Sequence, residues 1–107
     1  MALQFNSIQP VRFGEIEATP KMTTSSRMRV QKVKFGGDNI EAMETLAECF
    51  GNNSDGVLDF MKKNMTTLDL QRLQAYLIGG ESMLDTLDHT IDEFIKASMK
   101  KVQNEED

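Results

Sequence analysis

The chain has 107 residues, 39% of them hydrophobic, and a formal net charge of −5. This length suits one small domain with a modest core. A single cysteine, Cys49, excludes an intrachain disulfide and a cysteine metal cluster, and no apolar run reaches membrane-spanning length. Because the N-terminal sequence lacks the charged and apolar regions of a signal peptide, we expect a cytoplasmic protein.

The charge is distributed unevenly along the chain. Residues 1–35 carry six Lys or Arg and two Glu, a net charge of +4, whereas residues 36–107 carry six Lys or Arg and fifteen Asp or Glu, a net charge of −9. A basic front on an acidic body favours charge pairing between copies or within the chain. It disfavours DNA binding by the body, because phosphate contacts need clustered cations.

The first third of the sequence predicts extended structure. Alternating apolar and polar residues over 3–17, divided by Pro10, predict one or two short strands. The range 19–26 holds a proline and a run of small hydroxyl residues, which predicts a loop. The alternation over 27–35, RMRVQKVKF, predicts a strand, either with a bulge near Gln31 or as an edge strand protected by its cations.

Apolar residues at helical spacing predict three helices after Gly36-Gly37, over the ranges 39–50, 55–64 and 67–78. Asp38 and Glu41 have the spacing of a capping box at the start of the first, and Ser54 can cap the second. Thr66 or Thr67 can cap the third, with Asp69 or Gln71 returning the hydrogen bond. The glycine pair Gly79-Gly80 ends this helix or bends it into the next.

The stretch 81–102 predicts a long amphipathic helix, because apolar residues recur every three or four positions and no Gly or Pro interrupts it. Acidic residues dominate its first half and Lys96, Lys100 and Lys101 its end, an order that suits the helix dipole. Two interpretations stay open for the apolar stripe: it packs along a helical bundle within the chain, or it binds another chain. We take the following residues as the candidate protein-binding site: Met83, Leu84, Leu87, Ile91, Phe94, Ile95 and Met99.

The expected fold is therefore mainly α: a small helical domain of about four helices with a long C-terminal helix, preceded by a short β-hairpin or extended N-terminal arm. The expected divisions are a basic arm over 1–37, a helical domain over 38–103 and an acidic tail over 104–107. Eight methionines suit an adaptable apolar interface, and we expect the stripe to make the protein a homo-oligomer.

We find no pattern that predicts catalysis, a cofactor or a metal site, so we do not expect an enzyme. His89 lies among acidic residues on the long helix, but a solvated histidine is the simpler interpretation, since metal sites usually recruit ligands from several elements. Cys49 falls on an apolar helix face and is expected to be a buried free thiol. Residues 55–80 have a helix–turn–helix outline, with Gln71, Arg72 and Gln74 offered to base edges, but a single cation argues against DNA binding.

The run over 57–84, VLDFMKKNMTTLDLQRLQAYLIGGESML, resembles the tail assembly chaperones of long-tailed phages and prophages of Gram-positive bacteria. The residues that carry the resemblance lie at the joints and apolar positions of the predicted helices. They are Phe60, Asn64, Met65, Thr66, Asp69, Leu70, Leu73, Gln74, Tyr76, Leu77, Gly79 and Gly80.

This resemblance implies a small, largely helical, non-enzymatic protein of the host cell cytoplasm. It would bind the tape measure protein, or other phage tail proteins, during tail morphogenesis, with no nucleic acid or membrane as partner and no cofactor. The alternative is a structural phage tail or head–tail protein that is retained in the virion, and a further alternative is a small DNA-binding regulator. The sequence does not decide between them.

Overall fold

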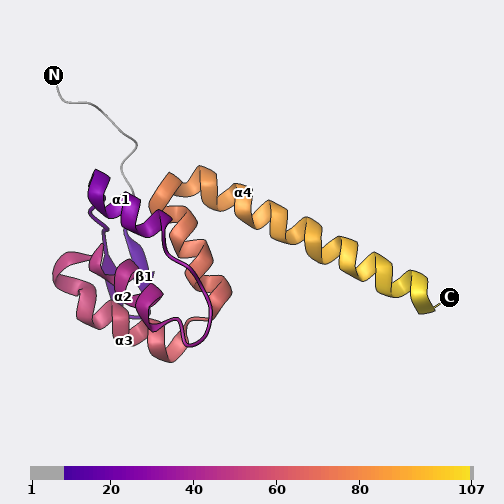
Figure 1. Ribbon diagram of the computed structural model, residues 1–107, viewed down its shortest axis with the longest axis horizontal. Coiled ribbons are helices and arrows are strands. Elements are labelled where there is room, and N and C mark those ends of the chain that lie inside the picture. Colours follow the sequence, from indigo (N-terminus) through magenta and orange to yellow (C-terminus); the bar gives the residue numbers. More distant parts are fainter. Residues whose placement is uncertain (1–8, 107) are drawn as a thin grey trace, which may run out of the picture.

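The computed structural model describes residues 9–106, with side chains as far as Met99. Within this range the fold is mainly helical, as expected, with four α-helices, a short 3-10 helix and a two-stranded antiparallel hairpin (Figure 1). The part of the first predicted strand region before residue 9 lies outside the described residues. The side chains of the expected acidic tail over 104–107 also lie outside the described range.

The hairpin joins β1 (Val11–Phe13) to β2 (Ile16–Ala18), with Phe13 opposite Ile16. Gly14 supplies the left-handed backbone of the two-residue turn, at φ 65°. The Phe13 side chain is buried and meets the rings of Phe50 and Phe60 edge-on, at centroid distances of 5.0 and 5.9 Å. The expected short strands are confirmed after Pro10, and they contribute to the core.

The strand predicted over 27–35 is wrong, because the structure has a helix there, α1 (Thr24–Gln31). The predicted loop also ends early, since Thr23 caps this helix by accepting a hydrogen bond from the Ser26 amide at 3.1 Å. Val30 is the single buried residue of α1. A helix that buries one side chain has no apolar stripe, which is why its sequence could be mistaken for a strand.

The next elements are α2 (Ile40–Glu48), η1 (Gly51–Asn53) and α3 (Ser54–Asn64), close to the predicted positions. Their caps differ from the prediction. Asn39, not Asp38, is at the N-cap of α2, and the expected capping box with Glu41 does not form. The Asn39 amide instead accepts from the Gly36 N–H at 2.7 Å and donates to the Thr67 hydroxyl at 2.9 Å. Ser54 lies inside α3 rather than at its cap.

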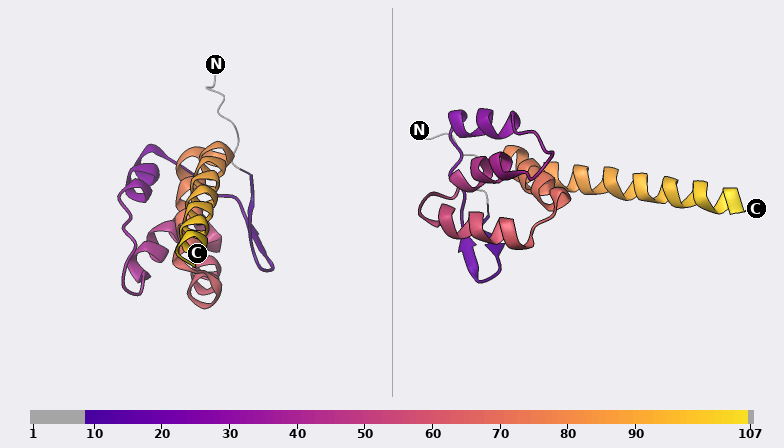
Figure 2. Two further views of the ribbon diagram at one scale, coloured as in Figure 1. Left: turned by 90° about the vertical axis from the view of Figure 1, so that its right-hand side faces the viewer. Right: turned by 60° about the horizontal axis from the view of Figure 1, so that its bottom comes forward.

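The last element, α4 (Thr67–Glu106), is two helices joined by a kink at Gly80, whose backbone has φ 71° and ψ −160°. The predicted capping box at its start is confirmed, because the Thr66 hydroxyl accepts from the Asp69 amide and the Asp69 carboxylate accepts from the Thr66 amide. We call residues 9–79 the head and residues 81–106 the rod. The rod leaves the head and projects from it, as Figure 1 and the right-hand view of Figure 2 show.

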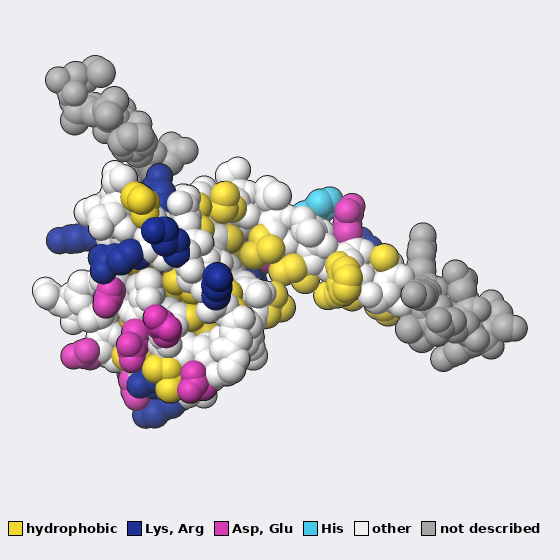
Figure 3. All heavy atoms as spheres, in the orientation of Figure 1, with side chains coloured by type: hydrophobic (Ala, Val, Ile, Leu, Met, Phe, Trp, Pro, Cys, Tyr) yellow, Lys and Arg dark blue, Asp and Glu magenta, His cyan; other side chains and the backbone are white. Residues whose placement is uncertain are grey.

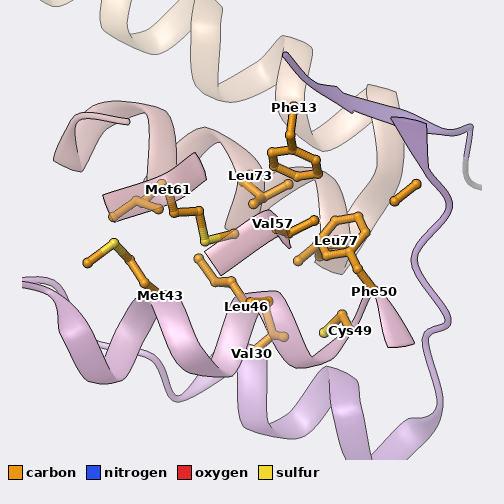
Figure 4. Close-up of a cluster of buried hydrophobic side chains, with 13 residues drawn as sticks. Phe13, Val30, Met43, Leu46, Cys49, Phe50, Val57, Met61, Leu73 and Leu77 are labelled. Atoms are coloured by element: carbon orange, nitrogen blue, oxygen red, sulfur yellow. The ribbon is translucent and has the colours of Figure 1, made fainter. Parts of the chain in front are cut away.

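The core lies inside the head, between the hairpin, α1, α2, α3 and the first part of α4 (Figure 4). Its residues come from both sides of residue 37, since the hairpin and α1 pack into the same cluster as the later helices. The expected boundary between an N-terminal arm and a helical domain therefore does not divide the core. Its buried members are Phe13, Ala18, Val30, Met43, Leu46, Ala47, Cys49, Phe50, Val57, Met61, Leu70, Leu73 and Leu77.

Candidate protein-binding surface

The rod carries an apolar stripe, which we define as the seven residues predicted from the sequence. Phe94 is 72% exposed and Met99 59%, and Ile95 and Met83 are also exposed. Leu84, Leu87 and Ile91 are half-buried. Packing along a helical bundle within the chain, the first of the two interpretations, therefore does not hold for the outer part of the stripe. Figure 3 shows apolar side chains along the edge of the rod that faces the head.

The direction of the rod is set at the kink. Gly80 adopts a backbone conformation that is essentially confined to glycine. A Cβ at this position would meet no atom within 4 Å, so the constraint lies in the backbone itself. Across the turn, Arg72 donates from Nε and from an Nη to the two carboxylate oxygens of Asp88, at 2.8 and 3.0 Å. This hydrogen bond from Arg72 holds the pKa of Asp88 below its usual value and raises the pKa of Arg72. The pair fixes the rod relative to the head.

A cavity of about 490 Å³ lies in the angle between the head and the start of the rod, and we call it the elbow cavity. Its wall is mainly apolar and also includes the charged residues Arg12, Asp69, Arg72 and Glu81. Leu84 of the stripe belongs to this wall, so the stripe and the cavity form one continuous surface. The cavity is lined by Gln9, Pro10, Val11, Arg12, Phe13, Phe60, Asn64, Met65, Asp69, Arg72, Leu73, Tyr76, Glu81 and Leu84.

Nothing in the sequence pattern indicates this cavity or the Arg72–Asp88 pair. Sixteen residues separate the partners, and nothing in a periodic pattern shows which way a chain turns at a glycine. The position of Gly79-Gly80 was a sign of a bend, but not of its angle.

The polar side of the rod is a solvated helix surface. Lys96 and Asp92 form an ion pair at 3.1 Å, and His89 Nε2 lies 3.2 Å from a carboxylate oxygen of Glu93, with all four side chains exposed. Such pairs one turn apart contribute about 0.2–0.5 kcal/mol each. Among the residues that the structure describes, no group of three or more His, Cys, Asp or Glu side chains could hold a metal ion. His89 is a solvated histidine, as expected.

Comparisons with protein-family models, with curated proteins and with solved structures found no match. No helix in the described part of the chain is long and apolar enough to cross a membrane.

Two of the three side chains that a DNA-reading helix would need are engaged in contacts within the chain. Arg72 is held by Asp88, and the Gln74 amide donates to the main-chain carbonyls of Val30 at 2.8 Å and Val33 at 3.4 Å. Gln71 and Arg72 are both exposed, but Arg72 is held by its ion pair with Asp88. This helix therefore offers base edges little to read.

The single thiol belongs to the core and not to a site. Cys49 is buried, as expected, and desolvation raises the pKa of its thiol. A neutral, buried thiol is a poor nucleophile. This leaves the rod and the elbow cavity as the surface most suited to binding.

Proposed function

We propose that this protein is a tail assembly chaperone of a long-tailed phage or prophage of Gram-positive bacteria, which binds the tape measure protein in the host cytoplasm. The observation that carries the proposal is the apolar stripe, which projects on the rod with its outer half uncovered by the chain. An exposed apolar surface of this kind typically marks a protein-binding site. The proposed activity is binding alone, without an enzymatic step.

The chemistry of the stripe suits a helical partner. Leu84, Leu87 and Ile91 form a row at helical spacing, and an amphipathic helix could lay its own apolar face against such a row. Met83 and Met99 at the two ends are flexible and polarisable, so they can adapt to a partner with a varied sequence. A long helical rod such as a tape measure protein presents many similar faces of this kind.

The resemblance of residues 57–84 to such chaperones adds support. Two of the joints that carry it form defined structure here, namely the Thr66–Asp69 capping box and the bend at Gly80. These joints place the stripe outside the head, where a partner can reach it.

Co-expression with the tape measure protein encoded beside its gene tests the proposal. We expect the chaperone to raise the soluble fraction of that protein and to co-purify with it. Phe94→Asp should abolish both effects, because it places a charge in the most exposed part of the stripe. Ser82→Asp is the matched control. It adds the same charge on the opposite side of the helix, because Ser82 lies nine residues, or two and a half turns, before Ile91.

An unchanged solubility of the tape measure protein in the presence of the wild-type protein would refute the proposal. Mass spectrometry of purified virions gives a second readout. A chaperone is absent from mature particles, whereas stable retention would favour the structural role.

A further inference from the structure

The free rod exposes large apolar side chains to water, and burying them against a partner would be favourable. We infer that a second copy of this chain covers the stripe: two rods pair antiparallel, and the end of each rod reaches the elbow cavity of the other. This inference goes beyond the proposed function, since it holds whatever other partner the stripe binds. Self-pairing and binding of a helical partner would then compete for one surface.

The first argument is the charge along the rod. Residues 81–95 carry five Asp or Glu and no Lys or Arg, whereas residues 96–106 carry three Lys and two Glu, so the rod is strongly acidic at its start and slightly basic at its end. A parallel pair would bring the two acidic halves together. An antiparallel pair lays the acidic half of each rod beside the lysines of the other, which is favourable.

The second argument is the side of the rod on which the stripe lies. The head and the stripe occupy the same side, as Figure 3 shows, and Leu84 lines a cavity together with Phe60 and Leu73 of the head. In a parallel pair the start of the second rod and its attached head would have to enter the space that the first head fills. In an antiparallel pair the two heads lie at opposite ends, and the two rods lie side by side with their stripes in contact.

The third argument is the elbow cavity. Its volume of about 490 Å³ and its apolar wall, which includes Phe60, Met65 and Leu84, fit the tip of an apolar helix face. The stripe ends on such a tip, at Met99, which is 59% exposed. The Glu81 side chain, which lines the cavity, would lie near the lysine-rich end of the partner rod. The rod of 26 residues is about 39 Å long at 1.5 Å per residue, long enough to lie along its partner and reach this cavity.

Sedimentation and pulsed electron paramagnetic resonance of the full chain test the arrangement. A spin label at Ser82, in a Cys49→Ala background, lies on the outer side of the rod. In an antiparallel pair centred near residue 92, the two labels are about 30 Å apart along the axis, so their separation exceeds about 30 Å. In a parallel pair they sit at the same level, about 20 Å apart.

We expect a dimer with the longer separation. Phe94→Asp should weaken the dimer at least tenfold and leave the circular dichroism spectrum of the diluted protein unchanged, because Phe94 makes little contact with the head. Ser82→Asp should leave the dimer intact. A protein that stays monomeric at about 100 μM, or a dimer with the shorter separation, would overturn the inference.

These measurements use the protein alone. A monomer would therefore remove the self-pairing and leave the tape measure proposal standing. Conversely, a failed co-expression experiment would leave the dimer untouched.

Discussion

Arg72 and Asp88 are sixteen residues apart in the sequence, yet two hydrogen bonds of 2.8 and 3.0 Å join them across the kink of α4. Arg72 belongs to the head and Asp88 to the rod. Planar, two-point pairing of a guanidinium with a carboxylate restricts orientation as well as distance. The pair therefore acts as a brace that sets the angle at which the stripe is presented.

Removing the brace should loosen the rod without unfolding the head. We expect Arg72→Ala to broaden the distribution of distances between spin labels at Lys34 and Ser98, measured in the monomeric Phe94→Asp background with Cys49 replaced by Ala. The melting temperature should change little, because both side chains are substantially exposed. Lys63→Ala is the control, since it removes an exposed ion pair with Asp59 inside one helix. Equal broadening in both variants would argue against a brace.

The brace should also respond to acid. Arg72 lowers the pKa of Asp88 in the folded protein, so the pair stabilises the bend at pH values above the ordinary Asp pKa of about 3.9. That contribution is lost as the pH falls through the lower pKa of the folded state. The same label distances should be constant from about pH 7 to pH 5 and broaden below about pH 4, whereas Asp88→Asn should give broad distances throughout. A distance distribution that is independent of pH in the wild type would contradict this account.

The bend itself should depend on the lack of a side chain at Gly80. Its φ of 71° with ψ of −160° is a conformation that other residues adopt at a cost of about 1–3 kcal/mol. We expect Gly80→Ala to lower the free energy of unfolding by about this amount, measured by urea denaturation. Gly36→Ala should be nearly neutral, because a Cβ there meets no atom within 4 Å and the backbone has no positive φ. If both substitutions lowered the free energy of unfolding equally, a side chain at position 80 would not strain the bend.

Replacing a large side chain by alanine should affect stability differently in the core and in the rod. Leu46 is fully buried and Phe94 is 72% exposed. Leu46→Ala should cost about 2–5 kcal/mol through lost burial and a cavity. Phe94→Ala in dilute protein should stay within about 0.5 kcal/mol. Urea denaturation measures both, and a large loss in dilute Phe94→Ala protein would show that the rod packs against the head.

Much of the helical part could be predicted from the sequence, because its signals are local. Thr66 and Asp69 have the spacing of a capping box, and that box forms. Gly79-Gly80 was a sign of an end or a bend, and the chain bends at Gly80. The apolar period that predicted the long helix continues through the rod without interruption.

The rest depends on contacts between distant residues. The helix α1 buries only Val30, and the carbonyl of Val30 is held by Gln74, forty-four residues later. No window of sequence contains that contact, so the alternation over 27–35 pointed to a strand. The departure of the rod from the head follows from the angle at Gly80 and the distant Arg72–Asp88 pair, which a periodic pattern does not encode.

The buried core ends at Leu77, before the bend, and the rod contributes none of its fully buried members. Stability and recognition therefore rest on different stretches of the chain. Substitutions in the stripe could accumulate as a binding partner changes, while the head keeps its fold. The bend thus separates the part of the chain that forms the core from the part that presents the stripe, so that the same head could carry a different binding surface.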